Sequence, residues 1–144
     1  MRIAPVLLAG ALVLAGCGKS DTPPAATEAD SPAAADPAPA VAPTVAMGEQ
    51  VFKRCVACHT VDKGGRNGIG PNLHGIVGAP VAAKPGFSYS GAMKAKGGNW
   101  DEAALDAYLA APMKAVPGTR MAFAGVIDAA DRKALILYLE AQSK

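Results

Sequence analysis

The chain has 144 residues, of which 51% are hydrophobic, and a formal net charge of +2 at pH 7. This charge is too small to indicate nucleic acid binding. It is also unevenly distributed, because residues 1–46 contain two basic and four acidic side chains, whereas residues 47–144 contain twelve basic and eight acidic ones. A mildly basic segment suits an acidic protein partner, so we expect such a partner and no nucleic acid.

Residues 1–16 have the pattern of an export signal. Arg2 supplies a positive charge at the start, and Ile3 to Ala15 form an apolar run rich in Leu, Val and Ala. That run is shorter than the ~20 residues that a membrane-spanning helix needs. The sequence therefore favours a signal peptide over an uncleaved transmembrane anchor.

Cys17 follows this apolar run directly, in the stretch Leu14-Ala15-Gly16-Cys17. The stretch resembles the lipobox of bacterial lipoproteins, in which the Cys becomes the lipidated first residue after cleavage. The alternative is a free Cys inside or just past an ordinary signal. The position of Cys17 and the Pro-rich tether after it favour a lipoprotein. Several acyl chains would anchor such a domain stably where one is marginal, at ~0.8 kcal/mol per buried methylene. It would lie in the bacterial periplasm, tethered to the inner or outer membrane through lipid on Cys17.

Residues 17–46 are predicted to be the lipidated Cys and a flexible linker. From residue 21 onward this segment is almost all Ala, Pro, Thr, Asp and Glu, and its six prolines prevent a continuous helix. The globular domain is therefore predicted at residues 47–144. A domain of roughly one hundred residues is marginal on its own hydrophobic burial, so something is expected to help fill its core.

The domain is predicted to be all-α, a few helices separated by long Gly- and Pro-rich loops. Apolar spacing and capping residues predict helices over residues 48–58 and 88–96, one starting after Asn99 and ending before Pro112, and one starting near Asp128. Loops such as residues 60–87 cannot form a core by themselves. A large apolar cofactor at the centre would give the short helices a surface to cover.

Cys55-Val56-Ala57-Cys58-His59 is the C-x-x-C-H motif of covalent haem attachment. The two thiols add to the haem vinyl groups, the two-residue spacer sets their separation, and the adjacent His points its imidazole at the iron. A zinc site would need a fourth ligand, and no further Cys is available nearby. A thioredoxin-like redox pair expects a βαβ setting and has no use for the His. A disulfide between the two would leave the rest of the chain unexplained.

Further motifs follow in order along residues 48–142, and with them the chain resembles class I cytochrome c of the mitochondrial and alphaproteobacterial type. They are Gly70-Pro71-Asn72-Leu73-His74-Gly75, Pro85-Gly86-Phe87-Ser88-Tyr89, Trp100, Tyr108-Leu109 and Pro117-Gly118-Thr119-Arg120-Met121-Ala122-Phe123-Ala124-Gly125. The resemblance implies a small all-α fold in which the N- and C-terminal helices cross beside one covalently bound haem c.

The resemblance also implies two axial ligands on the iron, His59 and Met121. The Pro71 carbonyl would accept a hydrogen bond from the other nitrogen of His59 and fix its orientation. The soft thioether of Met121 would raise the reduction potential relative to bis-His ligation. His74, Met113 and Met93 are the other candidates for the sixth ligand. Met121 is favoured because Pro117 and its neighbouring Gly can hold a non-helical loop against the haem face opposite His59.

The remaining cofactor-binding residues follow from the same resemblance. Tyr89 and Trp100 would donate hydrogen bonds to a haem propionate, Tyr108 and Thr119 would shape the Met121 side, and Phe123 would cover the exposed haem edge. The chain departs from the family where Met93 replaces an Asn and Ala79 an Arg, so that two polar partners near the propionates are missing. The basic rim around the haem edge is also thinner than in the family; it consists of Arg54, Arg66, Lys114 and Arg120.

The function implied is that of a one-electron carrier, not an enzyme, shuttling between membrane-bound respiratory or photosynthetic complexes. Its donor would be a quinol–cytochrome c oxidoreductase, and its acceptor a terminal oxidase or a photosynthetic reaction centre. The chain is expected to be a monomer. The alternatives are a haem peroxidase or gas-binding protein with a labile Met ligand, and a fixed redox subunit of a larger membrane enzyme.

Overall fold

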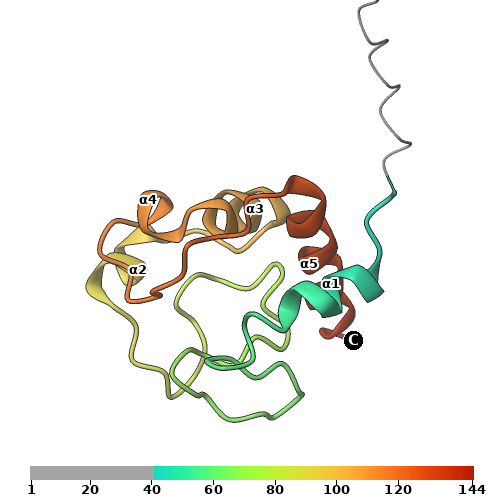
Figure 1. The fold of residues 1–144 in the computed structure, drawn as a ribbon. Coiled ribbons are helices and arrows are strands. Elements are labelled where there is room, and N and C mark those ends of the chain that lie inside the picture. Colours follow the sequence, from blue (N-terminus) through green and yellow to red (C-terminus); the bar gives the residue numbers. More distant parts are fainter. Residues whose placement is uncertain (1–40) are drawn as a thin grey trace, which may run out of the picture. The chain divides into compact units, whose positions relative to one another are not determined.

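The computed structural model describes residues 41–144, so the predicted signal peptide, the linker up to residue 40 and the predicted lipidation at Cys17 lie outside the described residues. Regular structure in residues 41–144 is helical, with one isolated β-bridge between Pro80 and Asn99. The helices are α1 (Val45–Phe52), α2 (Gly91–Lys96), α3 (Glu102–Ala110), α4 (Pro112–Ala115) and α5 (Ala129–Ala141) (Figure 1). The all-α prediction is confirmed. None of these helices is long and apolar enough to cross a bilayer.

Helix α1 differs from its prediction at both ends. It begins at Val45 instead of Gly48, because the Thr44 hydroxyl caps it by accepting a hydrogen bond from the Met47 N–H at 3.2 Å. It ends at Phe52, so the prediction of one helix running to Cys58 is wrong. Beyond Phe52 the chain tightens into turns with i→i+3 hydrogen bonds, such as that from the Cys55 N–H to the Phe52 carbonyl at 2.7 Å.

Helices α1 and α5 cross in contact, as the resemblance implied (Figure 1). A glycine makes the crossing possible, because a Cβ on Gly48 would lie 2.0 Å from the Ala134 carbonyl oxygen of α5. Beside it, the rings of Phe52 and Tyr138 pack with centroids 5.2 Å apart. Asp128 caps α5 as predicted, accepting a hydrogen bond from the Asp131 N–H at 2.9 Å.

Helices α2 and α3 both start later than predicted. Asp101, not Asn99, caps α3, accepting from the Ala104 N–H at 2.8 Å. The strand-like pairing around Pro80 and Asn99 explains the shift, because the Trp100 N–H donates to the Ala79 carbonyl at 2.8 Å and keeps the chain extended there. In α2 the first residue is Gly91, because Ser90 is extended and its hydroxyl acts as the cap.

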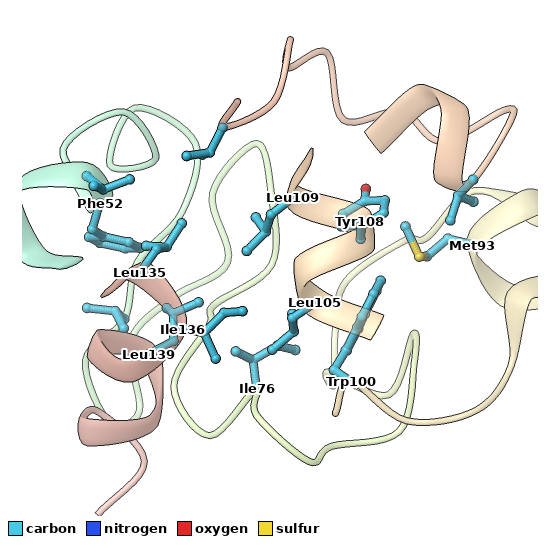
Figure 2. Packing of buried hydrophobic residues seen from close by; sticks show 14 residues of the cluster. Phe52, Ile76, Met93, Trp100, Leu105, Tyr108, Leu109, Leu135, Ile136 and Leu139 are labelled. Atoms are coloured by element: carbon cyan, nitrogen blue, oxygen red, sulfur yellow. The ribbon is translucent and has the colours of Figure 1, made fainter. Parts of the chain in front are cut away.

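The buried core joins the helix crossing to Trp100 and to Tyr108 of α3 (Figure 2). Phe52, Leu135, Ile136 and Leu139 lie at the crossing. Leu105 and Leu109 of α3 continue the cluster towards Trp100, Tyr108 and Met93. Burying an aliphatic side chain of this size contributes about 1.5–3 kcal/mol. The core therefore fixes the position of α3, whose Tyr108 contacts Met121.

Candidate haem site

Cys55 and Cys58 lie in the turns that follow α1, and both are half-buried thiols. No disulfide joins them. The Cys58 N–H donates to the Cys55 carbonyl at 3.0 Å, and the His59 N–H donates to the same carbonyl at 2.9 Å. Burial raises the pKa of the Cys55 thiol, although the Arg54 guanidinium opposes that rise, so the thiol stays protonated at neutral pH. This turn presents two thiols and one imidazole from five consecutive residues.

The His59 ring is fixed by a backbone carbonyl. Its Nδ1 lies 2.7 Å from the Pro71 oxygen, and because a carbonyl can only accept, Nδ1 carries the proton and donates. Nε2 is then the unprotonated nitrogen, which is the form that ligates a metal. Burial lowers the pKa of His59, and the bond to Pro71 offsets that only in part, so the ring is neutral at pH 7.

Gly70 leaves the space that this ring occupies. A Cβ there would lie 2.2 Å from His59 Cε1 and 2.6 Å from each ring nitrogen, so any other residue would displace the imidazole. The Gly70 N–H donates to the Cys58 carbonyl at 2.8 Å. The glycine therefore lets the chain pass directly behind the ring and deliver the Pro71 carbonyl to Nδ1.

Asn72 fastens this chain segment to the turn after His59. It is 7% exposed, and its Nδ2 donates to Thr60 Oγ1 at 2.7 Å and to the Asp62 carbonyl at 3.1 Å. Its Oδ1 accepts from the His74 N–H at 3.0 Å. His74 thus belongs to the segment that supports His59.

Met121 is held from α3 by Tyr108. The Tyr108 hydroxyl lies 3.5 Å from Met121 Sδ and 2.9 Å from Thr119 Oγ1, and the Met121 N–H donates to the same Thr119 oxygen at 3.3 Å. Burial raises the pKa of Tyr108, with the Thr119 hydrogen bond opposing, so the hydroxyl keeps its proton for donation. The Phe123 N–H donates to the Met121 carbonyl at 3.0 Å, which folds the loop back beside the thioether.

The other predicted aromatic residues form two separate pairs. Trp100 is buried and packs against Tyr108 with ring centroids 4.9 Å apart, and Lys96 Nζ lies 4.8 Å from the Trp100 ring centroid. Tyr89 is half-buried and pairs with Phe87 at 4.8 Å instead of joining Trp100. Burial raises the pKa of Tyr89, so its hydroxyl also stays protonated as a donor.

The turn that carries Cys55 and the loop that carries Met121 both pack against one hydrophobic core. Four of the predicted site residues are partly buried against that cluster: Cys55, Tyr89, Met121 and Phe123. The structure thus supplies two thiols, a neutral imidazole with a free Nε2, and a positioned thioether. In residues 41–144 no three His, Cys, Asp or Glu side chains gather as a metal site. An imidazole and a thioether together suit the iron of a haem.

A profile of the family described as "Cytochrome c" matches residues 45–143. The chain belongs to the cytochrome c family. It is 47% identical over 95 residues to cytochrome c2 of Rhodomicrobium vannielii, covering 66% of this chain and 76% of that one. It is 46% identical over 101 residues to cytochrome c of Gibberella zeae, covering 69% and 95%. Cytochrome c-type cyt cy of Rhodobacter capsulatus is 46% identical over 104 residues, covering 72% of this chain and 51% of that relative.

A solved structure has the same fold as the cytochrome. Cytochrome cH from Methylobacterium extorquens superposes with a TM-score of 0.64 at 42% identity, covering 68% of this chain and 98% of that one. The cofactor of the family is haem c, one per chain, attached here through Cys55 and Cys58. The residues present fit it, because both thiols are reduced and Gly70 leaves room for the imidazole. The cytochrome is a one-electron carrier, and the relatives favour that function over the peroxidase or gas-binding alternative.

Sequence reasoning missed two residues that bear on this site. Arg132 of α5 and Asp106 of α3 form an ion pair of 2.6 Å, and Arg132 also reaches the backbone of the loop after Met121. The pair joins residues 26 positions apart. No local pattern relates such positions, so nothing in the spacing of the sequence could have indicated the contact.

Proposed function

We propose that the cytochrome carries one electron on an iron whose axial ligands are His59 Nε2 and Met121 Sδ. The observation that carries the proposal is the contact of 3.5 Å between the Tyr108 hydroxyl and Met121 Sδ. It holds the thioether of a non-helical loop in place, as a permanent sixth ligand requires. With His59 and Met121 as its ligands, a haem would supply one-electron chemistry and would leave no open position for a substrate.

Each remaining residue has a task that follows from its surroundings. Cys55 and Cys58 keep the cofactor from leaving, and the Pro71 carbonyl holds His59 in the ligating tautomer. Tyr108 and Thr119 restrain Met121. Trp100 and Tyr89 keep N–H and O–H donors that can meet a propionate, which would satisfy a carboxylate that is otherwise costly to bury. Phe123 would cover the exposed edge.

The potential should be high for a c-type haem and sensitive to the propionate environment. A thioether ligand favours ferrous iron relative to a second imidazole. Met93 is 7% exposed, and this buried apolar side chain stands where the family carries an Asn. Because it offers a propionate no hydrogen bond, Trp100 and Tyr89 would be the main neutral donors in that region.

The docking partners would be a quinol–cytochrome c oxidoreductase as donor and a terminal oxidase or reaction centre as acceptor. The four residues of the basic rim are exposed, but Arg54 pairs with Asp131 at 3.6 Å and Arg120 donates to the Ser88 carbonyl. Met113 of α4 is 66% exposed. A basic rim that is partly engaged within the protein would steer an acidic partner only weakly.

The cytochrome would be tethered in the bacterial periplasm by lipid on Cys17. Residues 18–44 would then link the anchor to α1, a contour of about 80 Å if extended like polyproline at ~3.1 Å per residue. Such a tether favours a mobile carrier, which exchanges partners, over a fixed subunit.

A redox titration of the full-length holo-protein, followed by absorbance, tests the function. We expect a single one-electron transition and no binding of CO by the ferrous protein, because Met121 occupies the sixth position. Rapid, tight CO binding to the wild-type ferrous protein would instead support the gas-binding alternative. Co-purification with a large partner in fixed stoichiometry would argue against a mobile carrier.

A further inference from the structure

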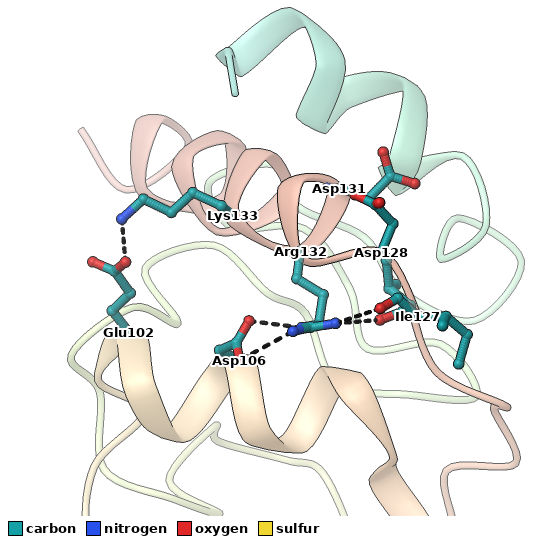
Figure 3. Close-up of polar contacts among 8 residues, drawn as sticks. Glu102, Asp106, Ile127, Asp128, Asp131, Arg132 and Lys133 are labelled. Carbon is teal, nitrogen blue, oxygen red and sulfur yellow. Dashed lines mark hydrogen bonds and ion pairs between the residues drawn. The ribbon is translucent and has the colours of Figure 1, made fainter. Parts of the chain in front are cut away.

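Arg132 has four hydrogen bonds that converge from two other parts of the chain (Figure 3). Its Nε lies 2.6 Å from Asp106 Oδ1 of α3, and its Nη2 lies 3.4 Å from Oδ2 of the same carboxylate. Its Nη1 donates to the carbonyls of Val126 at 3.0 Å and Ile127 at 2.8 Å. The Arg132 side chain is only 13% exposed, whereas that of Asp106 is 44% exposed, so the guanidinium itself is shielded from water and its bonds are charge-assisted.

The carbonyls that Arg132 binds, those of Val126 and Ile127, lie at the C-terminal end of the loop that carries Met121. The same stretch is also pressed onto the end of α3, because the Val126 N–H donates to the Leu109 carbonyl at 2.8 Å. Gly125 has φ +107°, and a Cβ there would lie 2.2 Å from the Ala110 carbonyl oxygen. This end of the loop is therefore in close backbone contact with α3.

Helix α3 thus restrains the loop on both sides of Met121. Upstream, Tyr108 binds Thr119 and reaches Met121 Sδ. Downstream, the Leu109 carbonyl and the carboxylate of Asp106, acting through Arg132, hold residues 126–127. If residues 126–127 moved away from α3, the loop could pivot about Thr119, which stays bound to Tyr108. This movement would draw the Met121 thioether away from the iron.

We propose that Arg132 is a positioning residue that keeps Met121 on the iron, by clamping the Val126 and Ile127 carbonyls to α3 through Asp106. The clamp sets the fraction of molecules in which the loop is open and an exogenous ligand can reach the iron. The proposal rests on the axial role of Met121 proposed above.

A second ion pair between the same helices supplies the control. Lys133 of α5 contacts Glu102 of α3, and both side chains are about half exposed, at 45% and 59% (Figure 3). Within residues 41–144, neither side chain of this pair hydrogen-bonds to residues 126–127. Disrupting it with Glu102→Gln removes an α3–α5 ion pair but leaves the loop clamp intact, so it separates loop positioning from general support of the helix packing.

The test is imidazole binding to the ferric holo-protein, measured by loss of the Met–iron charge-transfer band. Arg132→Lys keeps the positive charge, but a lysine cannot donate to the carboxylate and both carbonyls as the guanidinium fork does. Since apparent affinity scales with the fraction of open molecules, we expect imidazole to bind about tenfold more tightly, which corresponds to about 1.4 kcal/mol and is the size of one lost charge-assisted bond. Glu102→Gln should stay within about twofold of wild type.

Amide hydrogen exchange of the same holo-proteins gives a readout that does not depend on the iron. In Arg132→Lys the Val126 N–H should exchange faster, while the Leu135 N–H in the buried part of α5 keeps its protection. Asp106→Asn should show the same pattern with a smaller increase in imidazole affinity.

Equal imidazole affinities in Arg132→Lys, Glu102→Gln and wild type would overturn the proposal. So would a uniform loss of protection at Val126 and Leu135, which would show that Arg132 only stabilises the fold. If Arg132→Lys does not accumulate as holo-protein, Asp106→Asn decides, and an unchanged affinity there refutes the clamp. A wild-type protein without the charge-transfer band would instead contradict the axial role of Met121.

Discussion

Gly70→Ala is expected to disturb the site more than its single added methyl group suggests. The new Cβ would lie 2.2 Å from His59 Cε1 and 2.6 Å from both ring nitrogens. Because non-bonded carbon atoms pack at about 3.5–4.0 Å, the ring must withdraw by roughly 1.3 Å or more. The bond from Nδ1 to the Pro71 oxygen, now 2.7 Å, would then exceed the ~3.2 Å limit of a good N–H···O bond.

The cost has two parts. Overpacking a well-filled site costs about 1–3 kcal/mol, and the lost hydrogen bond adds about 1 kcal/mol. We therefore expect the holo-protein to lose about 2–4 kcal/mol of unfolding free energy in guanidinium titrations. The ferric spectrum should also change, because the ligating imidazole is no longer fixed by Pro71.

Gly91→Ala is the matched control. The chemical change is the same, but apart from its chain neighbours and the backbone of its own helix, nothing lies within 4 Å of the new Cβ, and Gly91 is the first residue of α2. Alanine is favoured over glycine in helices by roughly 0.5–1 kcal/mol, so this variant should be neutral or slightly more stable. If Gly70→Ala stays within about 0.5 kcal/mol of wild type, like an ordinary surface change, the close approach to His59 does not matter and the reasoning is refuted.

Three further outcomes are expected. Gly48→Ala should cost about 1–3 kcal/mol in the same titration, since its Cβ would meet the Ala134 carbonyl oxygen at 2.0 Å; a neutral result would mean that α1 and α5 separate freely. Cys17→Ser should release holo-protein into the soluble periplasmic fraction or block signal cleavage, whereas wild-type protein that is soluble without detergent would contradict the lipid anchor. Oxidation of a membrane partner should slow only modestly as the Debye length falls from roughly 30 Å at 0.01 M salt to about 10 Å at 0.1 M, and a rate that is flat or rises would remove the electrostatic argument.

Features that depend on residues close together in the sequence, such as a helix cap or a haem attachment motif, could be predicted from the sequence. The Asp128 cap and the apolar stripe of α5 could be predicted because a cap and a helical face depend on residues three and four apart. The haem attachment motif is likewise contained in residues 55–59. The resemblance predicted that Tyr108 and Met121 lie close together, because their motifs keep the family's order and spacing.

The predictions that were wrong depended on contacts between distant segments. Asn99 and Asp101 are both good caps, and the choice between them was made by backbone pairing with residues 78–81. Helix α1 stops at Phe52 although its composition permits helix to Cys58. Turns with i→i+3 hydrogen bonds follow, and they lead to His59, which bonds to the distant Pro71 carbonyl. The contact between Arg132 and Asp106 needs α3 and α5 to be packed first, and no spacing in the sequence encodes that.

The most direct test of the central claim, axial ligation by Met121, is the near-infrared-edge charge-transfer band of the ferric holo-protein. Wild-type protein is expected to show the weak band of a Met–iron bond. Met121→Ala should abolish the band, lower the reduction potential and open the ferrous iron to CO. Met113→Ala is the matched control, because that side chain is 66% exposed on α4 and should leave the band unchanged. A band that survives in Met121→Ala but is lost in Met113→Ala or His74→Ala would contradict the assignment.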